Sequence, residues 1–339
     1  ADAYRRLADG QIMKSTVPLE TGESSLTTNI GSVQNAGIEL GVNFGVIRNQ
    51  NFTWDVNVAF ARNWSKIKEL PSGDDVSNNW FIGERLNVLR DYTYAGVITA
   101  DGVTMHTING DKHYTLQEVY DKYGPKSPNK LKWYEGQMAV NDWNDDGKIN
   151  DEDKQIYGCT DPKWTGSLSS TMTYKGFDFS FMLYTKQGQW SRSYFHEQYM
   201  DISDRGRQKM SFDYYIPAGT PVLDKATGDI TYLETPHMGA YPYPNNYEKT
   251  GGGYFSKSSS GVRYQKTSFV KVKNITLGYT FPKKWMSKIA VKHLRLYVNV
   301  LNPFCFTGYD GFDPEWASAN LTDGGPASVT YQIGANIKF

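Results

Sequence analysis

The last twelve residues of the chain, 328–339, alternate apolar side chains with polar or small ones along their whole length. Successive side chains of a β-strand point to opposite faces, so this pattern predicts a strand with one apolar face and one polar face. The apolar positions are Tyr331, Ile333, Ala335, Ile337 and Phe339. Strands of the same kind occur in soluble β-sandwiches, so this segment alone does not choose between a sandwich and a membrane barrel.

The same alternation recurs in four other segments, and this recurrence favours a membrane barrel. Their apolar rows are Ile38, Leu40, Val42, Phe44 and Val46; Phe52, Trp54, Val56, Val58 and Phe60; Phe177, Phe179, Phe181 and Leu183; and Leu294, Leu296, Val298 and Val300. The opposite faces carry charged and amide side chains, among them Glu39, Asn43, Asp55, Asn57, Asp178, Arg295, Asn299, Asn336 and Lys338. Such faces are too polar for the core of a sandwich, but they suit a barrel with a wet lumen and lipid outside.

Composition indicates strands rather than helices as any membrane-spanning elements. No apolar run reaches the roughly 18 residues that a transmembrane helix needs, so the chain could cross a bilayer only as strands with closed hydrogen bonding. The 36 basic and 36 acidic residues cancel, which argues against nucleic-acid binding. The two cysteines, Cys159 and Cys305, are too few for a disulfide framework; we expect them to be unpaired, with a single bridge as the alternative.

The chain is predicted to be all-β, with eight strands separated by turns and loops of very different length. The expected strands are about 4–14, 31–47, 52–66, 163–174, 177–187, 262–281, 294–304 and 328–339. Three long connections lie between them, about 67–162, 188–261 and 305–327, and the first could contain a short strand over 90–99. Outer-membrane barrels alternate short periplasmic turns with long extracellular loops. This order therefore places the long connections outside the cell and the C-terminus in the periplasm.

Four segments resemble the SusC/RagA-like family of TonB-dependent outer-membrane transporters. They are Asn29–Leu40, Phe269–Pro282, Leu294–Phe304 and Gly308–Glu315, and the closing Phe339 adds to the likeness. The resemblance implies a transmembrane antiparallel β-barrel of roughly 22 strands filled by an N-terminal plug. The eight strands would then be the C-terminal part of that barrel. We expect the plug and the remaining strands on a second chain, if they are made at all.

The resemblance also implies a function, namely active import across the bacterial outer membrane with energy relayed from TonB. TonB would act through the N-terminal part that this chain lacks. A SusD-like surface lipoprotein would close over the barrel mouth, and the cargo would be an oligosaccharide or a peptide. The residues alone leave an alternative open, a self-contained eight-stranded barrel with a structural or adhesive role.

The sequence does not favour an enzyme. The histidines His106, His113, His196, His237 and His293 show no ligand-like spacing, and no nucleophile elbow or phosphate loop is present. The acidic pairs of the long connections are typical of a solvated loop surface. We therefore expect neither catalytic residues nor a catalytic cofactor.

The second long connection is rich in aromatic side chains, which favour contacts with cargo or with a partner protein. Tyr and Trp are enriched at protein interfaces, and the long connections are where we expect the SusD-like lipoprotein to bind. The candidates are Trp190, Tyr194, Phe195, Tyr199, Tyr214 and Tyr215. Ordinary packing inside the loop explains such a cluster equally well.

Residues 142–153 match a twelve-residue calcium-binding loop. Asp142, Asn144 and Asp146 occupy its first, third and fifth ligand positions, the Lys148 carbonyl its seventh and Asp153 its twelfth. Asp at the last position departs from the Glu of EF-hands and looks more like the dockerin variant. The alternative is a turn rich in Asp and Asn whose carboxylates are merely solvated. We expect a structural Ca²⁺ that pins the first long connection.

Overall fold

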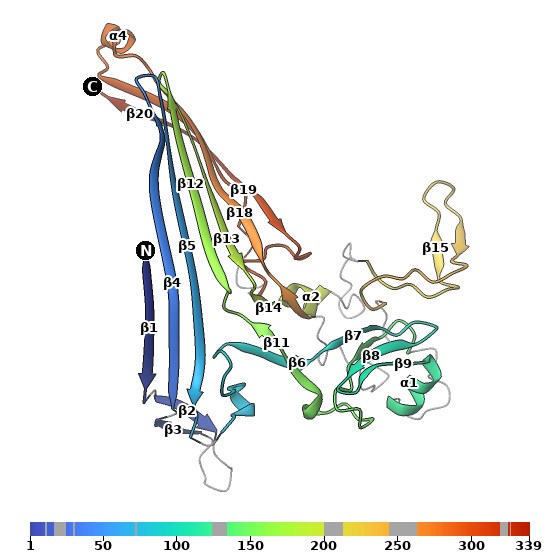
Figure 1. Ribbon diagram of the computed structural model, residues 1–339. Helices are drawn as coiled ribbons and strands as arrows, with labels where there is room; N and C mark the ends of the chain where they lie inside the picture. The colour runs from blue at the N-terminus through green and yellow to red at the C-terminus, as the bar shows by residue number, and fades with distance from the viewer. Residues whose placement is uncertain are drawn as a thin grey trace.

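The protein is described by a computed structural model that covers residues 1–10, 12–16, 25–29, 31–71, 73–123, 134–199, 213–243, 263–318, 325 and 327–339. For residues 12–16, 25–29 and 197–199 only the backbone is described. The main element is an antiparallel sheet of eight strands that pair in chain order (Figure 1). These are β1 (Asp2–Asp9), β4 (Ser32–Arg48), β5 (Phe52–Glu69), β12 (Trp164–Tyr174), β13 (Phe177–Gln187), β18 (Phe269–Thr280), β19 (His293–Thr307) and β20 (Thr330–Lys338). The predicted antiparallel all-β fold is confirmed.

Strand pairing gives this sheet one apolar face and one polar face. Val300 of β19 lies opposite Tyr331 of β20, and the next pair along is Asn299 with Gln332. Directly opposed residues share a face, so the two pairs lie on opposite sides of the sheet. The side-chain amide of Asn299 donates to that of Gln332 at 2.9 Å. The two-faced pattern predicted for the C-terminal segment is confirmed.

The apolar face is not covered by the rest of the chain. Ile333 of β20 is 86% exposed, and Phe177 of β13 is 51% exposed. Leu40, Phe44, Leu277 and Val298 are also exposed. Monomeric soluble proteins rarely expose a contiguous apolar surface of more than a few hundred Å², because water makes it unfavourable. The hydrocarbon of a bilayer is the surrounding that such a face suits.

On the polar face, tyrosine rings lie flat across glycines of the neighbouring strand. Tyr4 of β1 crosses Gly37 of β4, and its hydroxyl donates to Asn63 of β5 at 3.3 Å. Tyr297 of β19 lies over Gly334 of β20 in the same way. A Cβ atom at either glycine would collide with the ring, so these positions require the close approach that only glycine allows.

An ion pair joins two strands of the polar face that are not neighbours. The Arg295 guanidinium of β19 donates to the Asp178 carboxylate of β13 through Nε at 2.9 Å and Nη2 at 2.5 Å. The pair passes over Gly278 of the intervening β18. Two parallel hydrogen bonds of this kind fix geometry as well as charge, so three strands are held in register.

The short turns and the C-terminus lie at one end of the sheet, and the long connections lie at the other (Figure 1). The turn between β12 and β13 is two residues long, with Lys175 and Gly176 at φ of 45° and 94°. Left-handed conformations at both positions match the strand twist of a tight hairpin. Between β18 and β19, the short-turn end carries α4 (Lys283–Met286) and η7 (Ser287–Ile289).

The first expected strand, 4–14, was wrong in extent. β1 ends at Asp9, and Gly10 at φ 71° turns the chain out of the sheet. β2 (Ile12–Thr16) then pairs with β3 (Ser25–Asn29) in a separate two-stranded sheet. The expected first strand therefore contributes to two sheets rather than one.

The expected strand over 262–281 is divided into two. β17 (Tyr264–Lys266) pairs with β14 (Trp190–Arg192) outside the main sheet, and β18 follows. The break falls at Thr267, whose backbone N–H donates to the Gln189 carbonyl at 3.1 Å. Residue 262 lies outside the described residues. Two other strands are longer than expected, since β5 runs to Glu69 and β19 to Thr307.

The first long connection is a folded unit with its own core. Its elements are η2 (Val76–Asn78), β6 (Val88–Tyr92), β7 (Tyr94–Val97), β8 (Val103–Thr107), β9 (Gly110–Tyr114), α1 (Leu116–Tyr123), β10 (Met138–Val140), η4 (Asp151–Asp153) and β11 (Lys154–Cys159). The strand expected over 90–99 is thus two strands. The core consists of Ile98, Val103, Met105, Tyr114, Val119, Tyr120, Tyr123, Tyr134, Ala139 and Val140, all buried.

The second long connection contains α2 (Tyr194–Tyr199) and a hairpin of β15 (Pro221–Leu223) and β16 (Ile230–Tyr232), which projects away from the sheet (Figure 1). Among the described residues, no helix has the length and apolar character needed to cross a membrane. Cys159 is buried, Cys305 is exposed, and both are free thiols, as expected.

Candidate functional site

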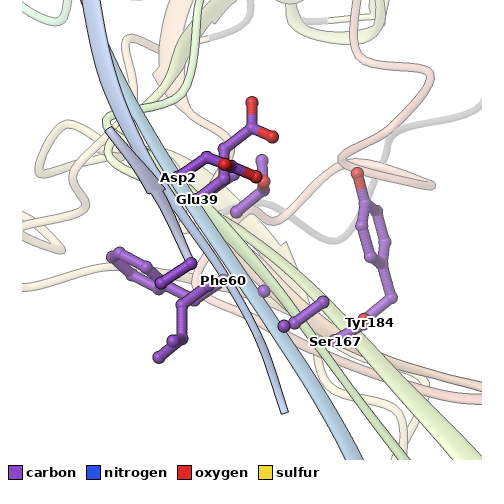
Figure 2. A pocket seen from close by; sticks show the side chains of 12 residues that line it. Asp2, Glu39, Phe60, Ser167 and Tyr184 are labelled. Carbon is purple, nitrogen blue, oxygen red and sulfur yellow. The ribbon is translucent and has the colours of Figure 1, made fainter. Parts of the chain in front are cut away.

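A pocket of about 340 Å³ lies against the polar face of β4, β5 and β12, next to the start of β1. Asp2 and Glu39 lie opposite each other on β1 and β4, and Tyr184 of β13 borders the other side. Figure 2 shows these three side chains on one side of the strands and the Phe60 ring on the other. The base is formed by small residues, namely Gly41, Ala59, Ala61, Thr165 and Ser167. Carboxylates and a phenol around a shallow base suit a ligand with hydroxyl or amino groups.

A buried ion-pair cluster ties the third long connection to the sheet. The Lys271 ammonium of β18 donates to both oxygens of Asp313, at 2.6 and 2.8 Å, and to Glu315 at 2.7 Å. Lys273 donates to the same Glu315 at 2.7 Å. Lys271 is only 3% exposed, so its charge depends on these partners. Two of the segments that resemble the transporter family are therefore in direct contact.

The second and third long connections meet at His196, which is fully buried. Its Nδ1 shares a hydrogen bond with the Ser193 hydroxyl at 2.7 Å, and its Nε2 shares one with Asp310 at 2.6 Å. The Tyr241 hydroxyl donates to the other oxygen of Asp310. Burial raises the pKa of Asp310, but the hydrogen bonds from His196 and Tyr241 outweigh it and hold the pKa below its usual range. The cluster links three segments that are distant in sequence.

Ser193, His196 and Asp310 are the residue types of a hydrolase triad and are joined by hydrogen bonds in that order, but the serine hydroxyl is buried. Ser193 is buried, and its hydroxyl also shares a hydrogen bond with the Tyr309 hydroxyl at 2.6 Å. A nucleophile must reach its substrate, whereas this oxygen is enclosed by its partners. The cluster therefore serves to hold the loops together.

Three of the six aromatic candidates are buried within the second long connection. Phe195 packs against Phe312 with ring centroids 4.5 Å apart. Tyr215 donates to Glu135 at 2.8 Å, and Tyr214 beside it is also buried. Loop packing accounts for these three side chains.

The other aromatic candidates differ from these. Trp190 of β14 and Tyr194 of α2 are partly exposed. Trp190 lies edge-on to Tyr157 at 5.6 Å, with the Lys266 ammonium 5.3 Å from its ring. Tyr199 ends α2, and its side chain lies outside the described residues. Trp190 and Tyr194 are thus the two described candidates that a ligand or partner can reach.

The segment predicted to bind calcium wraps its backbone around two buried carboxylates. Asp142 accepts from the backbone N–H groups of Asp146 at 3.2 Å and Gly147 at 2.9 Å. Asp153 accepts from the N–H groups of Trp143 and Asn150, both at 2.8 Å. Gly147 adopts φ 82°, as the sharp turn of a calcium loop requires. The backbone therefore fits the predicted loop.

A lysine contacts one of the predicted calcium ligands. The Lys122 ammonium donates to Asp142 at 3.2 Å and lies 3.6 Å from Asp145, and the Tyr123 hydroxyl donates to the same Asp142 oxygen at 2.6 Å. Across the described part of the chain, no three His, Cys, Asp or Glu side chains are grouped to hold a metal ion. Burial raises the pKa of Asp153 despite its backbone hydrogen bonds. A Ca²⁺ ion bound by this Asp142 oxygen would compete with Lys122, and its binding stays a prediction.

A sheet with one exposed apolar face, one polar face and long connections at one end has the form of an outer-membrane barrel wall. Comparison with known proteins agrees. The chain is 29% identical to TonB-dependent receptor P39 of Formosa agariphila and 28% identical to TonB-dependent receptor SusC of Bacteroides thetaiotaomicron, in both cases over its whole length. It spans 33% and 30% of the lengths of these two relatives. No family model matches the chain.

Solved structures show the same fold. The RagAB peptide transporter superposes with a TM-score of 0.64 at 18% identity, covering 99% of this chain and 33% of the other. The RagAB peptide importer in its "closed-closed" state gives a TM-score of 0.63. The resemblance to SusC/RagA-like TonB-dependent transporters is therefore confirmed.

Proposed function

We propose that this chain forms part of the barrel wall of a TonB-dependent importer in the bacterial outer membrane. The observation that carries the proposal is the eight-stranded sheet, whose apolar face is exposed along the strands while the long connections gather at one end. A bilayer would bury the apolar face, and the polar face would line the lumen. The similarity of the whole chain to about a third of each TonB-dependent receptor supports the same function.

The proposed orientation places the long connections outside the cell and the C-terminus in the periplasm. Short periplasmic turns and long extracellular loops are the rule in such barrels. In this orientation the folded first connection and the cluster around His196 stand in water, where their buried cores are stable. A SusD-like lipoprotein would bind these connections, with Trp190 and Tyr194 among the accessible aromatic side chains.

The sheet requires further strands in order to function in a membrane. β1 and β20 lie at opposite edges, and each pairs with one strand of the main sheet. An open edge cannot lie in hydrocarbon, because its backbone groups would lack hydrogen-bond partners. We propose that polypeptide outside residues 1–339 supplies the remaining strands, a plug and the contact with TonB. The alternative of a self-contained eight-stranded barrel would need β1 to pair with β20.

Site-directed labelling tests the orientation. Lys175→Cys and Lys225→Cys place one thiol in the turn between β12 and β13 and one in the turn between β15 and β16, with Cys159 and Cys305 changed to Ser. A membrane-impermeant maleimide should label Lys225→Cys on intact cells and Lys175→Cys only after the outer membrane is permeabilised. The reverse pattern would refute the orientation, and labelling of both thiols on intact cells would refute a membrane between them.

Uptake experiments test the transport itself. Cells that lack this protein should lose uptake of one class of labelled cargo, either oligosaccharides or peptides, and cells without TonB should lose the same class. Mild-detergent purification should recover a surface lipoprotein together with this protein. Unchanged uptake of both cargo classes would rule out import as the function.

A further inference from the structure

The turn between β18 and β19, residues 281–292, carries four lysines and no acidic residue. The lysines are Lys283, Lys284, Lys288 and Lys292. All four are exposed, and none forms an ion pair with a side chain that the structure describes. Like charges this close in the chain repel one another, so an anionic surface beside the turn is favourable.

The other short turns at the same end of the sheet are also basic. Arg48 begins the turn between β4 and β5, and its guanidinium donates to Asp55 at 2.7 Å. Lys175, in the turn between β12 and β13, is exposed. The one carboxylate near the start of β13, Asp178, is paired with Arg295. The charged residues of the three short turns, 48–51, 175–176 and 281–292, are therefore all basic.

A row of aromatic rings on the apolar face leads to the lysine-rich turn. Phe177 of β13 lies opposite Tyr279 of β18, with ring centroids 4.5 Å apart. The Phe281 ring is 4.9 Å from Tyr279, and the Trp285 ring of α4 is 6.5 Å from Phe281. Aromatic rings with a polar tip favour the border between hydrocarbon and water. The row therefore places the lysines at this border of the proposed bilayer.

The turn is held to the sheet while its apolar side chains stay outside. Met286 is buried, and its carbonyl accepts from the Val291 N–H at 3.2 Å. The Lys292 N–H donates to the Lys338 carbonyl of β20 at 2.7 Å. Trp285 is 55% exposed and Ile289 is 61% exposed. Lysines beside exposed apolar side chains suit a membrane surface, whereas a soluble anionic polymer would use the charges alone.

We propose that residues 281–292 bind anionic phospholipid headgroups of the leaflet that faces the periplasm. The lysine ammonium groups contact the phosphates, and Trp285 and Ile289 lie at the start of the acyl chains. A basic residue close to an anionic membrane surface contributes about 1 kcal/mol, and this attraction falls off within a Debye length of about 10 Å. The contact fixes the depth of the barrel wall at this end. The inference rests on the proposed membrane location and orientation of the sheet.

Native mass spectrometry of the complete complex, purified from membranes and stripped of lipid in detergent, tests the proposal. Phosphatidylglycerol is the anionic probe, and phosphatidylcholine with the same acyl chains is the comparison without net charge. Lys288→Gln should lower phosphatidylglycerol retention about fivefold, and Lys284→Gln with Lys288→Gln about twenty-five-fold, since each lysine contributes about 1 kcal/mol. Lys288→Arg keeps the charge and should restore retention. Trp285→Ala should lower retention of both lipids.

A matched control removes the same charge at the other end of the molecule. Lys225→Gln alters an exposed lysine in the turn between β15 and β16, and it should retain lipid as the unchanged protein does. Equal retention of the two lipids by the unchanged protein, or an equal loss in Lys225→Gln, would overturn the lipid site. Binding to isolated peptidoglycan that Lys288→Gln abolishes, without any lipid preference, would assign the turn to that polymer instead. A chain that fractionates without membranes would overturn the proposed function on which the inference depends.

Discussion

The main sheet and the first long connection use the same kinds of residues in opposite ways. In the first connection, Met105, Val119 and Tyr123 are buried in a core of the ordinary soluble kind. In the sheet, apolar side chains such as Phe177 and Ile333 stay exposed, because the polar side chains fill the other face. One region is built for water outside and the other for hydrocarbon outside. The difference lies in the surroundings rather than in the composition.

Two strands show why alternation alone does not reveal the surroundings. In β8, Val103, Met105 and Thr107 are buried, and the residues between them are exposed. In β20, apolar side chains alternate with polar or small ones just as regularly, but no side chain along the strand is buried. Period-two alternation therefore predicts a strand with two different faces, and only the exposure of the apolar face distinguishes a membrane strand from a soluble one.

The largest expected loss of stability comes from breaking the contact between the main sheet and the third long connection. Lys271→Met should lower the free energy of unfolding by about 3–5 kcal/mol, because it leaves Asp313 buried without its cation. The loss should appear first as faster hydrogen exchange in residues 308–317. Lys273→Met is the matched control, since Glu315 keeps Lys271 as a partner; we expect less than about 1 kcal/mol. Equal losses would show that the buried cluster does not anchor the loop.

A charge placed on each face of β13 tests the difference between the faces. Phe181→Lys puts an ammonium on the apolar face and should cost about 2–4 kcal/mol in lipid vesicles, because the charge would lie near the bilayer midplane. Ser180→Lys, one residue earlier, puts the same charge on the polar face and should cost under about 1 kcal/mol. Urea unfolding in vesicles measures both values. A larger loss for Ser180→Lys would reverse the assignment of the faces.

Acid should loosen the contact between the second and third long connections. The pKa of Asp310 is lower in the folded protein than in an unfolded chain, where it is about 3.9. The carboxylate therefore adds stability that is complete above about pH 4 and is lost as the pH falls through the folded pKa. Limited proteolysis of residues 213–243 between pH 6 and pH 3 should show this loss.

Two variants give the acid experiment its comparison. Asp310→Asn should be cleaved faster at pH 6 and should show little further change on acidification. Asp213→Asn, which alters an exposed pair with His237, should behave like the unchanged protein. Acid sensitivity that survives Asp310→Asn would assign the effect to another group.

The smallest expected effect concerns the predicted calcium loop. Lys122→Gln removes the ammonium that competes for Asp142. It should raise Ca²⁺ affinity about fivefold, since an ion pair whose lysine stays partly exposed is worth roughly 1 kcal/mol. Lys148→Gln keeps the backbone carbonyl and removes an exposed charge, so its affinity should change little. Isothermal titration measures both. Absence of Ca²⁺ binding in the unchanged protein and in Lys122→Gln alike would leave the lysine as the permanent cation of this loop.

The strands could be predicted where one face meets lipid, and they were misjudged where both sides meet water. Alternation identified β13 and β20 closely, since their apolar rows are unbroken. It ended β5 at Lys66, three residues early, because Lys66 and Lys68 interrupt the apolar pattern although the strand continues to Glu69. Hydrogen bonding between strands holds the backbone there, and the side chains carry no signal of it.

The candidate sites show the same limit more strongly. The ligand pattern of residues 142–153 is local, so its backbone could be predicted from spacing. Lys122, whose ammonium donates to Asp142, lies in α1, twenty positions before that aspartate. Nothing in the sequence of the loop indicates this contact. His196 and Asp310 are separated by 114 positions. Contacts of this range depend on how the loops fold over one another, which residue spacing does not encode.

The tyrosines that lie across glycines have a consequence for the width of the proposed passage. A ring that lies flat on Gly334 or Gly37 stays close to the sheet, so it does not project into the proposed lumen. A methyl group at either glycine would tip Tyr297 or Tyr4 inwards and narrow the bore at that level, with the same number of strands. If the proposed import is correct, two residues with no side chain help to set the width available to a cargo, and exchanging either glycine for alanine would narrow the bore by one tilted ring.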